Sequence, residues 1–183
     1  MPKPSLVVIL VEDERHEMLV RRYLRRLQME AHQMTFLRSP SGAGSAEQWV
    51  RTRFAKEVRA YRSRHARAAS ALIVMIDADA HSVDERIDQL DQSLTEDGAP
   101  VVRARERVVR LIPKRNVETW ILCLNGESVD EETDYKRART DWNELIPPAS
   151  ATLFRWTRPN AKLAIGCTDS LRRGVDELTR LAT

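Results

Sequence analysis

The stretch ALIVMIDADAHS, residues Ala71 to Ser82, decides the fold of this chain. A run of apolar residues, several of them β-branched, leads directly into Asp77 and Asp79. Such a run is typical of a strand that is covered on both faces, as in a parallel sheet. A buried strand that ends on two carboxylates indicates either a solvated strand end or a site that holds something positive.

Similar patterns lie on both sides of this stretch. Apolar runs predict strands at Leu6–Val11, Met34–Leu37, Leu72–Ile76 and Val108–Ile112. Helical periodicity predicts helices over Glu14–Met29, Ala46–Ala68, Ser82–Leu94, Asn116–Leu124, Asp130–Leu145 and Ser170–Leu181, the fifth of them broken by Pro147-Pro148. Strands that alternate with helices predict an α/β fold with a Rossmann-like, mainly parallel central sheet flanked by helices.

The bulk composition is that of a soluble globular protein. The 183 residues are 42% hydrophobic and 31% charged, which favours one domain over 1–183, with 126–183 as a helical C-terminal extension of unclear role. No apolar run approaches the roughly 18–20 residues of a membrane helix, and no secretory segment opens the chain. The two cysteines, Cys123 and Cys167, form no C-x-x-C pair, which favours a reducing, cytoplasmic location without a membrane.

The charge is unevenly distributed although the net charge is only +3. One segment holds seven basic residues opposed only by Glu57: Arg51, Arg53, Lys56, Arg59, Arg62, Arg64 and Arg67. A clustered basic face is the usual electrostatic footprint of a protein that binds a polyanion. A solvated helix face explains the same pattern equally well, and the sequence leaves both interpretations open.

Charged residues follow three of the predicted strands, at the edge where parallel sheets bind ligands. Glu12 ends the first strand, Asp77 and Asp79 end the Leu72–Ile76 strand, and Lys114-Arg115 follow the last one, with Glu118 one helical turn further on. In an extended chain residues i and i+2 point to the same side, so Asp77 and Asp79 can converge. Converging carboxylates repel one another unless a cation lies between them, and oxygen ligands suit Mg²⁺ or Mn²⁺.

This order of motifs resembles the Toprim domain, which topoisomerases, primases and OLD-type nucleases share. VILVEDERHEMLVRRYL is similar to the first Toprim motif, with Glu12 as its acid, and VMIDADAHSVDERIDQL to the D-x-D motif, with Asp77 and Asp79. IPKRNVETWILCL resembles the Arg-x-x-Glu segment of small nuclease-like members. The resemblance covers roughly Leu6 to Leu124. Asp13 stands where Toprim proteins usually have glycine, and His16 where nuclease-like members often have aspartate.

The resemblance implies a Toprim-like nuclease, a Mg²⁺- or Mn²⁺-dependent hydrolase that binds DNA or RNA, in a setting such as phage defence. Its implied catalytic residues are Glu12, Asp77, Asp79, Lys114 and Glu118. Glu12, Asp77 and Asp79 would hold one ion, and Glu118 with His16 or Glu17 a second. Arg115 would contact the nucleic acid.

A loop rich in small residues precedes the basic segment and lacks the G-K-[ST] of a nucleotide-binding P-loop. Backbone N–H groups of such a loop can bind phosphate at the start of a helix. The residues expected to touch a nucleic-acid backbone are Ser41, Gly42, Gly44, Ser45, Arg51 and Arg53. A plain flexible loop is the alternative.

Two other functions remain open. A non-catalytic Toprim-like subunit would bind nucleic acid or a protein partner such as an ATPase, and His16 in place of an acid favours it. A response-regulator receiver would use Asp77 as phosphoacceptor and Lys114 as its lysine. The spacing of Asp13, Asp77 and Lys114 departs from receivers, which have no use for Asp79. The oligomeric state, including a homodimer, is not determined.

Overall fold

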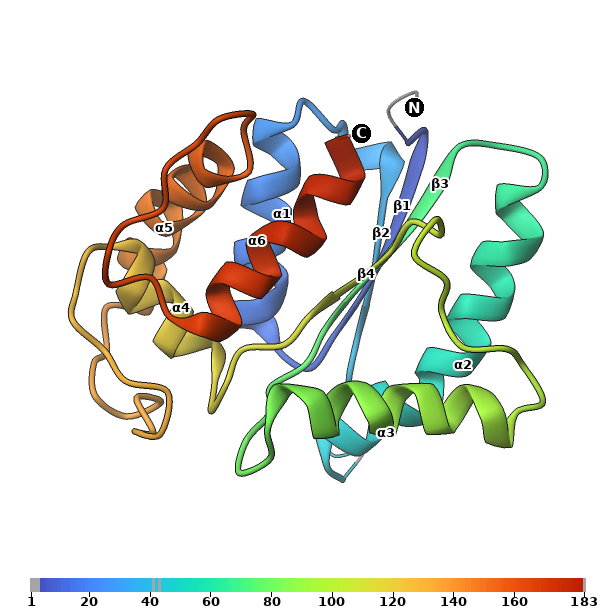
Figure 1. The fold of residues 1–183 in the computed structure, drawn as a ribbon, viewed down its shortest axis with the longest axis horizontal. Coiled ribbons are helices and arrows are strands. Elements are labelled where there is room, and N and C mark those ends of the chain that lie inside the picture. The colour runs from blue at the N-terminus through green and yellow to red at the C-terminus, as the bar shows by residue number, and fades with distance from the viewer. Residues whose placement is uncertain (1–3, 41, 43, 183) are drawn as a thin grey trace.

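The computed structural model describes residues 4–40, 42 and 44–182. Within them, one sheet has the strand order β2-β1-β3-β4, and all neighbouring strands are parallel. The strands are β1 Leu6–Val11, β2 Met34–Arg38, β3 Ser70–Met75 and β4 Val108–Leu111. Helices cover both faces of the sheet (Figure 1), which confirms the predicted Rossmann-like α/β class.

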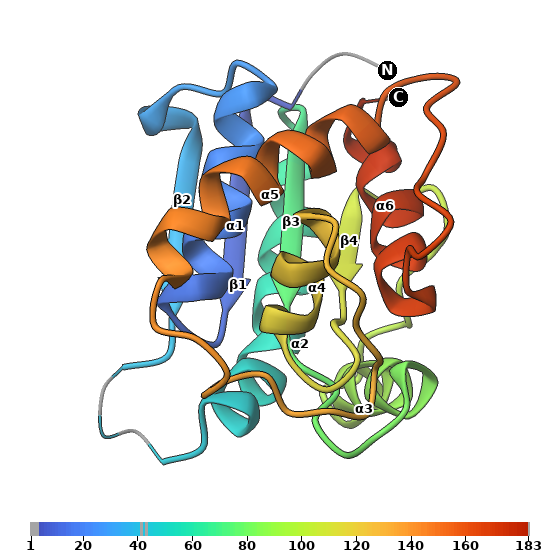
Figure 2. The same ribbon diagram turned by 90° about the vertical axis from the view of Figure 1, so that its left-hand side faces the viewer.

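The helices form two layers. They are α1 Glu14–Arg26, α2 Ala46–His65, α3 Val83–Glu96, α4 Val117–Leu124, α5 Trp142–Trp156 and α6 Asp169–Ala182, and a 3₁₀ turn spans Ala31–Gln33. Figure 2 shows α1, α4, α5 and α6 on one face of the sheet, while α2 and α3 lie behind it. No helix in the described ranges is both long enough and apolar enough to cross a membrane.

Alternate residues of each strand feed two separate cores. Ile9, Ile73 and Val109 face α1, α4, α5 and α6, whereas Leu10 and Leu72 face α2 and α3. β1 and β3 lie in the middle of the sheet and are almost fully buried, which explains why their sequences are continuous apolar runs.

Side-chain caps fix where the helices next to the strand ends begin. Asp13 accepts hydrogen bonds from the first-turn N–H groups of α1, and Asn116 does the same for α4. Ser82 and Glu85 form the capping box of α3 that the sequence predicts. Each cap sets the direction in which the helix leaves the carboxyl edge of the sheet.

The predicted helix Asp130–Leu145 is wrong. Residues 126–141 form turns and bends, because Asp130 hydrogen-bonds the backbone N–H groups of Glu132 and Thr133 and so competes with helix formation. The helix begins instead at Trp142 and continues through the two prolines. Its buried face packs against α1 and α4, and this burial outweighs the backbone hydrogen bonds that proline cannot donate.

The contact between α6 and α4 yields a first prediction. A Cβ atom added at Gly174 of α6 would overlap the fully buried ring of Trp120 on α4. Gly174→Ala should therefore lower the free energy of unfolding by about 1–3 kcal/mol, even though alanine favours a helix. Urea denaturation measures the change. Gly166→Ala, where a Cβ meets open space, is the matched control, and equal stability of the two variants would contradict the packing.

Candidate metal centre

The centre begins where β1 and β3 end side by side. Val11 pairs with Met75 in the sheet, so the residues that follow these strands emerge together. The backbone N–H of Asp77 donates to Glu12 Oε1 at 2.5 Å. Both side chains are held at the carboxyl edge of the sheet, and the Asp77 side chain is only 1% exposed. Here the structure places two sequence-predicted acids next to one another.

His16 joins these two acids from the first turn of α1. Ligand atoms of Glu12, His16 and Asp77 all lie within 4.8 Å of one another, so the cluster could hold a metal ion. His16 Nε2 lies 3.0 Å from Asp77 Oδ1, and His16 Nδ1 lies 2.8 Å from Asp13 Oδ1. The imidazole therefore bridges two carboxylates.

The electrostatics of this bridge favour a charged imidazole. Burial alone would lower the pKa of His16, but the negative charge of Asp77 and hydrogen bonds to Asp13 and Asp77 raise it well above its usual value. Burial likewise acts to raise the pKa of Asp13, and contacts with His16 outweigh it and hold that pKa below its usual range. A protonated imidazole donates from both nitrogens, so His16 must lose its proton before it can bind a metal.

Glu12 has a perturbed pKa. Burial, together with the nearby negative charges of Asp77 and Asp79, raises its pKa to about 7, although the positive charge of His16 and the N–H of Asp77 act in the opposite direction. A carboxylate that resists ionisation beside other carboxylates is the condition that a bound cation relieves.

Asp79, the third acid expected to bind the ion, lies beside the cluster of Glu12, His16 and Asp77 and is not one of its three members. Its φ is +53°, so the extended geometry assumed from the sequence does not persist beyond Asp77. An isolated bridge to Arg115 holds the turn, and Arg86 Nη2 lies 3.5 Å from Asp79 Oδ2. Burial and the charge of Asp77 raise the pKa of Asp79.

Lys136 is the cation that spans the D-x-D pair. Its Nζ lies 3.5 Å from Asp77 Oδ2 and 3.8 Å from Asp79 Oδ1. Burial acts to lower the pKa of Lys136, but the charges of Asp77 and Asp79 prevail and raise it. The two carboxylates thus lie beside one shared positive charge, which belongs to the chain itself, whereas the sequence predicts a metal ion at this position.

The acids expected at a second ion are separated. Glu118 is fully buried, and its Oε1 accepts from Arg15 Nη1 at 2.6 Å. Burial, together with the charge of Asp77, raises the pKa of Glu118. Glu17 points elsewhere and pairs with Arg21 and Arg38. The structure therefore keeps Glu118 near the cluster and places Glu17 outside it.

The basic residues before α4 have structural contacts. Lys114 Nζ donates to the carbonyl oxygen of His81 and lies 3.6 Å from Glu132. Arg115 has a φ of +69° and pairs with the Asp79 backbone. The lysine that contacts Asp77 and Asp79 is Lys136, whereas Lys114 contacts His81 and Glu132.

Of the expected phosphate-binding loop, Ser41 lies outside the described residues. Gly42 and Gly44 have φ values of +80° and +81°, and Ser45 caps α2 by accepting from the N–H of Gln48. The two arginines behind the loop already have acidic partners. Arg51 pairs with Glu47 at 2.5 Å, and Arg53 pairs with Glu57 at 3.2 Å.

The side chains present fit a divalent cation. Asp77 Oδ2 and Glu118 Oε2 are buried and have no hydrogen-bond partner among the described residues. Asp77 Oδ1 and Glu12 Oε1 are engaged by the protein, and each carboxylate keeps one oxygen for another ligand. Buried carboxylate oxygens without donors, beside acids of raised pKa, are the chemistry that Mg²⁺ or Mn²⁺ satisfies.

Sequence reasoning did not assign three residues that organise the site. Lys136 lies in an irregular segment, Arg86 is a fully buried arginine in an otherwise polar helix, and Arg15 pairs across the fold with Glu118. Arg86 also contacts the Ala78 carbonyl and Glu47. For Arg86, the one signal in the sequence is its position on α3, shortly after the D-x-D motif. The other two contacts depend on tertiary structure.

The fold and the site together define an α/β protein with an acidic centre at the carboxyl ends of parallel strands. No family model matches the sequence, and no match is found among the curated proteins. Among solved structures, the chain is similar to the C-terminal region of the OLD protein of Xanthomonas campestris pv. campestris, with a TM-score of 0.39 and 15% identity over 97% of this chain and 94% of that one. This likeness is too weak to assign a role to any residue.

The raised pKa of Glu12 predicts a pH-dependent effect of Glu12→Gln. The folded protein keeps this proton up to about pH 7, whereas an ordinary glutamate loses it near 4.5, so ionisation costs stability as pH rises through 7. In EDTA, the stability of Glu12→Gln relative to the natural chain should grow from about pH 5 to about pH 8, by at most about 3 kcal/mol.

Denaturant unfolding at several pH values measures this difference. Glu14→Gln, at the exposed start of α1, is the control and should show no such growth. A Glu12→Gln effect that stays constant with pH would refute the raised pKa of Glu12.

Proposed function

We propose that this chain is a divalent-metal-dependent phosphodiesterase that acts on nucleic acid, similar to the Toprim nucleases. The observation that carries the proposal is the pair Glu12 and Asp77 at neighbouring strand ends, both buried, with a donor-free oxygen on Asp77. The presence of Asp79 beside the same Lys136 ammonium extends this pair to the full D-x-D set.

The metal would be held by Glu12, Asp77 and Asp79. Mg²⁺ or Mn²⁺ held by these residues would supply Lewis-acid chemistry, that is, it would polarise a scissile phosphate and lower the pKa of a bound water. His16 Nε2 lies 3.0 Å from Asp77 Oδ1 and orients that carboxylate. Glu118, positioned by Arg15, is the acid available for a second ion.

Lys136 supplies the positive charge of the proposed reaction. While its ammonium contacts Asp77 and Asp79, it balances charge in the resting site. When these acids bind a divalent ion, the same ammonium is free to stabilise charge that develops on the phosphoryl oxygens. The proposal assigns this role to Lys136 in place of Lys114, which contacts His81 and Glu132.

A non-catalytic binding subunit is the second candidate, and one observation favours it. The D-x-D acids already contact three basic side chains of the chain, His16, Lys136 and Arg86. Such a site is electrostatically satisfied without a metal. The receiver alternative has less support, because the Asp77 side chain is 1% exposed and is tied to His16.

Asp77→Asn tests the proposed activity. The natural chain should cleave plasmid or single-stranded DNA with Mg²⁺ or Mn²⁺, and the variant should lose at least about 100-fold in rate, because it removes a ligand charge from the centre. Asp84→Asn on the exposed surface of α3 is the matched control. Retained DNA binding without cleavage under any divalent metal would exclude the phosphodiesterase and favour the binding subunit.

Lys136→Met separates the two roles of the lysine. Removal of the competing ammonium should tighten Mn²⁺ binding by about tenfold, whereas cleavage at saturating Mn²⁺ should slow. Calorimetric Mn²⁺ titration and single-turnover cleavage measure the two effects. Lys162→Met, at an exposed position, should change neither. Weaker Mn²⁺ binding in Lys136→Met would contradict the competition between ammonium and metal.

A further inference from the structure

The basic segment that the sequence singles out is largely neutralised in the folded protein. Four of its seven basic residues pair with carboxylates. The pairs are Arg51–Glu47, Arg53–Glu57, Arg59–Asp97 and Arg62–Glu106. A carboxylate partner cancels positive charge that would otherwise attract a phosphate. The free positive charge of α2 is therefore smaller than its sequence suggests.

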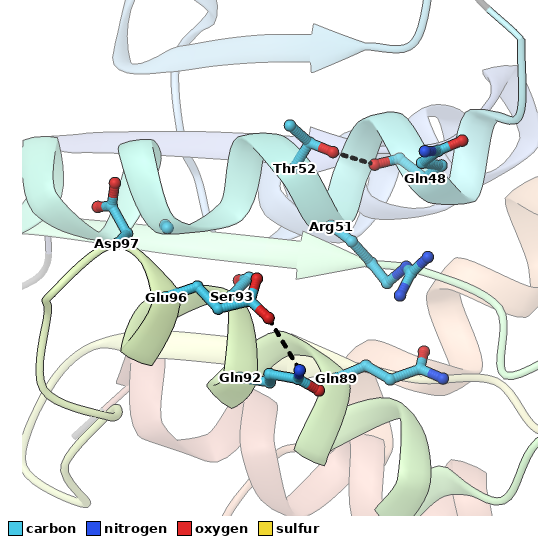
Figure 3. Close-up of a pocket in the computed structure, with 9 residues that line it drawn as sticks. Gln48, Arg51, Thr52, Gln89, Gln92, Ser93, Glu96 and Asp97 are labelled. Carbon is cyan, nitrogen blue, oxygen red and sulfur yellow. Dashed lines mark hydrogen bonds between the residues drawn. The ribbon is translucent and has the colours of Figure 1, made fainter.

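The groove between α2 and α3 illustrates this neutralisation. Figure 3 shows Gln48, Arg51 and Thr52 of α2 opposite amide and hydroxyl side chains of α3. Glu96 and Asp97 also line the groove, and Arg51 is paired with Glu47. This groove has a volume of about 420 Å³, but its charge does not suit a polyanion.

The arginines of α1 differ from those of α2. Arg22 and Arg25 are exposed, and their side chains form no ion pair or hydrogen bond within the described part of the chain. Arg21 and Arg38 share a single acid, Glu17. These four arginines are thus opposed by one carboxylate, and they leave a net positive face on α1 and the end of β2.

A groove between α1 and β2 runs beside these arginines. It has a volume of about 580 Å³, and its lining includes Arg21, Arg38, the acid Glu17 that these two arginines share, and Phe36. The Arg21 guanidinium lies 3.9 Å from the centroid of the Phe36 ring. Arginine charge beside a partly buried aromatic ring is the combination that binds a single nucleic-acid strand, since the charge holds phosphates and planar groups stack on bases.

The groove starts next to the acidic centre. Arg38 pairs with Val11 in the sheet, and Val11 directly precedes Glu12. Neighbouring strands are about 4.8 Å apart, so the groove opens one strand away from the centre. Arg22 and Arg25 lie roughly 12–17 Å further along α1 from its first residue. Figure 2 shows α1 beside β2 and β1, as this path requires.

We propose that the surface formed by Arg21, Arg22, Arg25, Phe36 and Arg38 binds the sugar–phosphate backbone of a nucleic-acid strand that extends from the acidic centre. The proposal deepens the proposed function and rests on it for the kind of polymer. Contacts of this kind are independent of sequence and weaken with salt, because each phosphate that binds releases counterions. α2 is then not the main nucleic-acid surface.

The test is R22E/R25E, measured by fluorescence anisotropy with labelled oligothymidylate in EDTA, so that binding is separated from cleavage. Both residues are exposed and unpaired, so the fold should be preserved, and circular dichroism checks it. Binding should weaken at least about tenfold, and the slope of log affinity against log salt should fall by about 1.4, or about 0.7 for each lost phosphate contact.

R103E/R105E carries the same change of charge on exposed residues before β4 and should bind as the natural chain does. K56E/R67E tests α2 directly and should weaken binding less than R22E/R25E. Equal losses in either comparison variant, or an unchanged R22E/R25E, would overturn the proposal. So would a natural chain that binds anionic vesicles but not oligothymidylate.

The experiment distinguishes this proposal from the proposed function. If R22E/R25E loses binding and the natural chain does not cleave DNA, the nucleic-acid surface is supported and the phosphodiesterase function is excluded. If the natural chain cleaves DNA and R22E/R25E binds as well as the natural chain does, the phosphodiesterase function is supported and this surface is excluded.

Discussion

The buried carboxylate of Asp77 is the constraint on which the site depends. A carboxylate that is taken out of water is costly unless positive charge and hydrogen bonds replace its hydration. α1 contributes His16 to Oδ1, and the segment between α4 and α5 contributes Lys136 to Oδ2. Two segments far apart in sequence are thereby drawn to the end of β3, and their contacts fix the geometry of the centre.

The same constraint explains why the centre suits exchange between cations. Glu12, Asp77, Asp79 and Glu118 gather their negative charge around Lys136, and two of their buried oxygens, Asp77 Oδ2 and Glu118 Oε2, have no hydrogen-bond donor among the described residues. An ammonium group at 3.5–3.8 Å balances this charge without the short contacts that a divalent ion makes with carboxylates. The resting site is thus stable in its own right and open to a cation of higher charge.

The sheet and the core of the site were predictable because they depend on local patterns. Continuous apolar runs identify β1 and β3, and the residues directly after them must emerge at one edge of a parallel sheet. Glu12 and Asp77 follow from that rule. Asp79 is carried beside the cluster by a left-handed turn at φ +53°, whereas the sequence predicts extended geometry there.

The remainder of the site depends on contacts that no local pattern encodes. Lys136 and Arg15 meet their acids across the fold, and the segment around Lys136 was expected to be helical because its turn-forming Asp130 was not recognised. The number of basic residues in the sequence also overestimates the free positive charge of α2. Asp97 and Glu106, the acids that pair with Arg59 and Arg62, come from other parts of the chain.

The central claim is that Glu12 and Asp77 form a metal site from which Lys136 is displaced. Anomalous diffraction from crystals soaked in Mn²⁺ tests it most directly. The claim predicts an anomalous peak about 2.1 Å from oxygens of Glu12 and Asp77, with the Lys136 ammonium moved away from Asp77. Saturating Mn²⁺ without a peak there, and with Lys136 still between Asp77 and Asp79, would contradict it.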